Sequence, residues 1–97
     1  MRIRALLALV ALAVLPAAPV WADYKQAYSE GIKALDTGKW AEVARLMRQA
    51  AAEQPREGER IKIYGMRFET YLPHFYLGQA LAETNDCAGA LKAFAAS

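Results

Sequence analysis

The chain has 97 residues, and its 12 lysines and arginines nearly balance its 10 aspartates and glutamates, for a formal net charge of +2. The two surplus bases are Arg2 and Arg4, so residues 23–97 carry equal numbers of basic and acidic side chains. Residues 23–97 therefore have no excess of basic charge that would predict binding to nucleic acid or to an anionic membrane. Cys87 is the only cysteine, which excludes a disulfide within the chain.

Residues 1–22 have the layout of a secretory signal peptide. The two arginines are followed by an apolar run from Ala5 to Leu15, and small side chains stand at Val20 and Ala22, the −3 and −1 positions of a cleavage site. As a helix this run covers about 16 Å, roughly half the hydrocarbon thickness of a bilayer. We therefore predict a cleaved signal peptide helix, a periplasmic or secreted protein, and no membrane contact after cleavage. An uncleaved membrane anchor is the alternative.

Residues 23–57 read as an antiparallel pair of helices. Apolar and small side chains recur at spacings of three and four, which indicates one buried face on each helix. Gly38 between the two stretches can adopt the left-handed conformation that ends helices, and Pro55 ends the second. The two stripes consist of Tyr24, Ala27, Tyr28, Gly31, Ile32 and Leu35, and of Trp40, Val43, Ala44, Met47, Ala50 and Ala51.

Residues 71–97 repeat this pattern and align with the first segment when Gly31 is placed over Gly78. Asn85 then takes the turn position of Gly38, and Asp86 is a good N-cap for the last helix. The alignment also places Tyr71 over Tyr24, Phe75 over Tyr28, Cys87 over Trp40, Ala90 over Val43, Phe94 over Met47 and Ser97 over Ala50.

With these residues in register, the chain resembles the tetratricopeptide repeat family. The resemblance implies an all-α fold of two antiparallel helical hairpins, 23–57 and 71–97, the second incomplete. Glu30, where the family usually has an apolar residue, and the extra residues 58–70 depart from the pattern. The family's packing positions match Gly31, Trp40, Val43, Met47, Ala50, Gly78, Ala90 and Phe94. Its concave binding groove matches Lys25, Tyr28, Ser29, Ile32, Leu35, Leu72, Phe75, Gln79 and Ala82.

The insertion 58–70 alternates apolar and charged residues from Ile61 to Phe68, which predicts extended chain, in the form of a short strand or a bent arm. It is too apolar for a free loop. We expect Tyr64, Met66 and Phe68 to be at least half buried. The insertion either packs on its own hairpins or lines and regulates a binding groove.

Catalytic and metal chemistry find little support in the sequence. His74 and Cys87 are the only histidine and the only cysteine, and they lie at opposite ends of a predicted helix, too far apart to act together. No ligand set for zinc is present, so we predict no metal, no cofactor and no enzymatic activity for this chain. Cys87 either takes the semi-buried place of Trp40 or forms a disulfide with a cysteine beyond Ser97.

We therefore expect an exported helical-repeat module that binds another protein or peptide through a largely apolar concave groove. Since Ser97 falls within a helix, we expect the chain to continue into further repeats or to complete itself against a partner. The alternative function is a structural spacer or assembly segment of a larger cell-envelope protein, with no ligand of its own.

Overall fold

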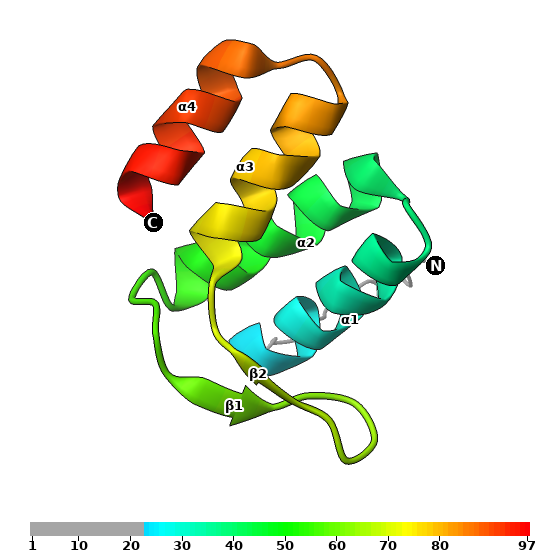
Figure 1. Cartoon of the computed structure of the whole chain (residues 1–97). Helices are drawn as coiled ribbons and strands as arrows, with labels where there is room; N and C mark the ends of the chain where they lie inside the picture. The colour runs from blue at the N-terminus through cyan, green and yellow to red at the C-terminus, as the bar shows by residue number, and fades with distance from the viewer. Residues whose placement is uncertain (1–22) are drawn as a thin grey trace, which may run out of the picture.

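The computed structural model describes residues 23–97, so the predicted signal peptide lies outside the described residues. Residues 23–97 are mainly helical, which confirms the helical class, and they include a small two-stranded sheet (Figure 1). The elements in chain order are α1 (Tyr24–Asp36), α2 (Trp40–Glu53), β1 (Arg60–Lys62), β2 (Phe68–Thr70), α3 (Pro73–Glu83) and α4 (Cys87–Ala96).

The helix ends follow from local residue chemistry. The Asp23 carboxylate accepts a hydrogen bond from the Lys25 amide at 3.0 Å, and the Asp86 carboxylate accepts one from the Gly89 amide at 2.9 Å. The two interhelical turns contain residues with positive φ, Gly38 at 71° and Asn85 at 68°. Both turns therefore reverse the chain in the same way, as the alignment of the two segments predicts.

The four helices form a sequential stack. The helix α2 packs between α1 and α3, and α3 packs between α2 and α4 (Figure 1). The core lies along the α1–α2–α3 contacts, where Tyr28, Val43, Met47 and Ala50 are fully buried.

Each helical pair has one close contact at a glycine. A Cβ atom built on Gly31 would lie 2.7 Å from the Cε of Met47, and one built on Gly78 would lie 2.5 Å from the Cε1 of Phe94. Both glycines are buried in helix interiors, where glycine costs up to about 1 kcal/mol relative to alanine. Close approach of the two helices explains why glycine stands there despite that cost.

The insertion is a β-hairpin, so it contains the short strand that was one of its two predicted forms. Ile61 pairs with Glu69 and Lys62 pairs with Phe68 in an antiparallel register. At the tip, Gly65 has a φ of 64° and lets the chain reverse. The side chains of Ile61 and Ile63 point inward and are buried.

The expectation of at least half burial was wrong for Met66, whereas Tyr64 is mostly buried as expected and Phe68 lies just at the limit. Met66 is 81% exposed because it stands at the tip, and Phe68 is 48% exposed. Residues directly opposite in an antiparallel pair point to the same face, so Phe68 shares the outward face of its exposed partner Lys62. Phe68 instead packs under the Arg60 guanidinium, 5.7 Å from the ring centre.

A cluster of tyrosines joins the hairpin to the helices. The Tyr71 ring lies 4.9 Å from that of Tyr28 and 5.0 Å from that of Tyr24, both in edge-to-face geometry. The Tyr28 hydroxyl donates to the Thr70 carbonyl at 2.7 Å and accepts from the Leu72 amide at 3.1 Å. Burial raises the pKa of Tyr28 above its ordinary value. Tyr28 is therefore held in this core as a neutral phenol.

An exposed polar cluster holds the hairpin tip against α1. The Tyr64 hydroxyl donates to the Asp36 carboxylate at 2.9 Å, and Arg67 pairs with the same carboxylate at 3.0 Å and with Glu69 at 2.9 Å. The hydrogen bond from Tyr64, and after it the one from Arg67, lower the pKa of Asp36 below its ordinary value. The hairpin is thus fixed to α1 by apolar burial underneath and by ion pairs at the rim.

Candidate functional site

The first hairpin does not offer the groove that the resemblance implies. Tyr28 and Ile32 are buried, and Leu35 is half-buried against the core. This part of the groove prediction is wrong because Tyr71, Thr70 and the β-hairpin cover that face of α1. Lys25 remains exposed and Ser29 is half-buried.

The matching positions on α3 are more accessible. Phe75 is 42% exposed, and Ala82 is exposed near the other end of the helix. Leu72 and Gln79 are half-buried. The predicted groove is therefore open only over the second hairpin.

The accessible surface of the second hairpin includes three large apolar side chains: Phe75, Leu91 and Phe94, here called the α3–α4 apolar patch. Their exposed fractions are 42%, 72% and 39%. The rings of Phe75 and Phe94 are 5.9 Å apart, and Leu91 stands one turn before Phe94 on the same side of α4.

The equivalent residues of the first hairpin are covered. Tyr28, Ala44 and Met47 align with Phe75, Leu91 and Phe94, and they are 0%, 6% and 0% exposed. The helix α2, which carries Ala44 and Met47, packs between α1 and α3, whereas α4 packs mainly on α3. The patch is thus the counterpart of a surface that the first hairpin buries against the rest of the chain. Leu91 is not among the predicted groove residues, although its alignment with the small Ala44 was a usable signal.

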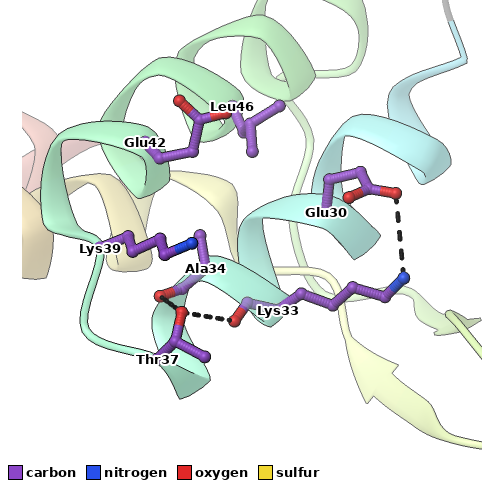
Figure 2. A pocket seen from close by; sticks show the side chains of 7 residues that line it. All are labelled: Glu30, Lys33, Ala34, Thr37, Lys39, Glu42 and Leu46. Carbon is purple, nitrogen blue, oxygen red and sulfur yellow. Dashed lines mark hydrogen bonds and ion pairs between the residues drawn. The ribbon is translucent and has the colours of Figure 1, made fainter.

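A first hollow lies between α1 and α2 near their connecting turn and has a volume of about 300 Å³ (Figure 2). Its charges are mixed, since Glu30 and Lys33 lie 4.0 Å apart and Lys39 and Glu42 stand on the opposite side. The Thr37 hydroxyl is engaged with the end of α1. The lining residues are Glu30, Lys33, Ala34, Thr37, Lys39, Glu42 and Leu46.

A second hollow, of about 400 Å³, lies over α3 between α2 and α4 and is here called the α2–α4 hollow. It occupies the equivalent place in the second hairpin, since Glu30, Ala34, Glu42 and Leu46 align with Leu77, Leu81, Gly89 and Ala93. The acidic Glu30 and Glu42 of the first hollow are thereby replaced by Leu77 and Gly89, so the second hollow has a more apolar lining. The lining residues are Arg48, His74, Leu77, Leu81, Gly89, Lys92, Ala93 and Ala96.

A third hollow, of about 360 Å³, is lined by Gln54, Arg56, Glu57 and Glu59. The carboxylate of Glu57 accepts hydrogen bonds from the His74 amide at 2.7 Å, from the Phe75 amide at 3.3 Å and from the Ser97 hydroxyl at 2.7 Å. Glu57 thus caps the start of α3, which gives this site a structural role.

The two residues considered for catalysis lie apart. His74 is in the first turn of α3, where its Nε2 lies 3.0 Å from the Pro55 carbonyl oxygen, and Cys87 is an exposed free thiol at the start of α4. Because Cys87 is exposed, it does not take the half-buried place of Trp40. A disulfide beyond Ser97 stays a prediction.

Two further observations concern residues 23–97. Within this range, no three histidines, cysteines or acidic residues are grouped so that they could hold a metal ion. None of the helices in the same range has the length and apolarity that a membrane crossing requires.

Comparisons of the chain with protein-family models, with curated proteins and with solved structures found no match.

Proposed function

We propose that this chain is an exported helical-repeat module, similar to tetratricopeptide repeats, that binds another protein or peptide through the α3–α4 apolar patch. Repetition supports the repeat assignment. Gly31 and Met47 form the close contact of the first hairpin, and the aligned Gly78 and Phe94 form that of the second. Export follows from the layout of residues 1–22.

The exposure of the α3–α4 apolar patch is the observation that carries the proposal. Large apolar side chains that are exposed together mark interaction surfaces in small proteins. Two of the three are aromatic, the residue class enriched at the cores of protein interfaces. The aligned residues of the first hairpin are covered by protein, so a protein segment is the kind of occupant that this surface fits.

Site-specific photocrosslinking in the producing cell tests the proposal. A photoreactive phenylalanine analogue at position 75 or 91 should give a discrete crosslinked product, and Leu91→Ser should remove the product formed from position 75. The matched control places the same analogue at Gln26 or Gln49, which are exposed on α1 and α2 away from the patch. Equal labelling at patch and control positions, or none at all, would contradict the proposal and favour a spacer.

A further inference from the structure

We infer that the α2–α4 hollow is a separate docking site for an acidic amphipathic helix of a partner protein. It lies on a different flank of α4 from the α3–α4 apolar patch, since Gly89, Lys92 and Ala96 point away from Leu91 on the helix. The inference therefore goes beyond the proposed function and does not rest on it.

The floor of the hollow is apolar. Leu77 and Leu81 supply it from α3, and Gly89, Ala93 and Ala96 flank it from α4. The three positions on α4 span two helical turns, about 10 Å along the axis, and their side chains are short. Two successive turns of an approaching helix match this length, and aliphatic side chains on those turns can reach the leucines.

The charged groups at the rim have one sign. Arg48 on α2 and Lys92 on α4 line the hollow and are exposed, and no described residue forms an ion pair with either. His74 adds an imidazole, whose Nε2 faces the Pro55 carbonyl oxygen. No carboxylate of residues 23–97 is among the lining side chains. Carboxylates of a partner would complement this rim, and cationic partners would be repelled.

The equivalent hollow of the first hairpin serves as an internal comparison. Its acidic Glu30 and Glu42 correspond to Leu77 and Gly89, and its bases are balanced by these acids. A hollow at the equivalent place therefore recurs in the chain with two acidic side chains in its lining and without the single-sign rim. We expect the partner to bind only the second of the two.

Selection from a random 16-residue peptide library displayed on phage, with the purified chain as target, tests the inference. Selected peptides should be rich in aspartate or glutamate, with aliphatic residues at helical spacing. Their synthetic versions should bind Arg48→Glu/Lys92→Glu at least tenfold more weakly than the unmodified chain. The control Lys25→Glu/Lys39→Glu changes the net charge equally in the first hairpin and should change affinity less than twofold. All variants should retain the thermal midpoint, since the four side chains are exposed.

The remaining outcomes overturn the inference. Peptides without acidic enrichment, peptides insensitive to Arg48→Glu/Lys92→Glu, and no enriched peptides at all would each do so. Displacement of the peptides by dodecanoate at equal or higher affinity would assign the hollow to a small anionic amphiphile instead. Peptides that lose affinity with Leu91→Ser but not with the double charge reversal would support the proposed function while overturning this inference.

Discussion

The contact between Gly78 and Phe94 can be tested with Gly78→Ala. This substitution should destabilise the unmodified chain but stabilise a variant in which Phe94→Ala has removed the ring. A Cβ at position 78 would lie 2.5 Å from the Cε1, 2.6 Å from the Cδ1 and 3.0 Å from the Cγ of the ring. Carbon atoms in favourable contact sit roughly 3.5–4.0 Å apart, so the ring must move by about 1 Å or the helices must separate. The ring also packs on Phe75, which restricts its movement.

The expected change in the free energy of unfolding is the difference between an overpacking cost and a gain in helix propensity. Overpacking typically costs about 1–3 kcal/mol, whereas alanine in place of glycine inside a helix contributes about 1 kcal/mol. Gly78→Ala should therefore lower the free energy of unfolding by about 0–2 kcal/mol. When Phe94→Ala has already removed the ring, only the helix term remains, and the same change should raise the free energy of unfolding by up to about 1 kcal/mol.

Urea unfolding of the unmodified chain, both single variants and the double variant gives the four values needed, and the coupling energy should be about 1–3 kcal/mol. Thermal melts offer a second measure, since about 1 kcal/mol shifts the midpoint by roughly 4–8 °C in a domain of this size. Gly31→Ala provides a comparison with a smaller expected penalty, because the obstacle there is the flexible end of Met47. Equal stabilisation by Gly78→Ala in both backgrounds would refute the close contact.

Four other substitutions probe the core and the hairpin. Tyr71→Phe should cost about 1–3 kcal/mol in urea unfolding, because the hydroxyl that donates its one hydrogen to the carbonyl oxygen of Ala50 or Gln54 at the end of α2 is lost; an unchanged value would show that water replaces it. Ile61→Ala should cost about 2–5 kcal/mol and Met66→Ala less than about 0.5 kcal/mol, and similar costs would contradict the observed hairpin register. The lowered pKa of Asp36 means that its contribution to stability is present above its unfolded pKa, near 4, and is lost as pH falls through the folded pKa. The stability difference between the unmodified chain and Asp36→Asn should therefore shrink as the pH falls below about 5, and a constant difference would exclude an ionic role for this carboxylate.

The helices could be predicted from the sequence because each follows from local signals. The apolar spacing of α1 and α2, the turn residues Gly38 and Asn85 and the N-cap Asp86 act within a few residues of their positions in the chain. The structure has a helix at each predicted stretch and a positive φ at both turn residues. Such elements need no information about distant parts of the chain.

The fold of the insertion 58–70 could not be predicted from local signals alone. Alternation correctly separated Ile61 and Ile63 from their charged neighbours, but it does not say where an extended chain folds back. The reversal near Gly65 placed Met66 at a tip and set Phe68 opposite the exposed Lys62. The groove prediction depended on the same missing information, since a chain that folds back over α1 covers residues that an open repeat would expose.

The way in which the hairpin is fixed determines which surface a partner can reach. The ion pairs of Arg67 are exposed, and exposed pairs contribute little. The burial of Ile61 and Ile63 contributes more, about 1.5–3 kcal/mol for each side chain. A partner that needed the covered face of α1 would have to expose both, at a total cost of about 3–6 kcal/mol in a domain whose stability is about 5–15 kcal/mol. Binding at the second hairpin carries no such cost, so we expect partners to bind there while the β-hairpin stays in place.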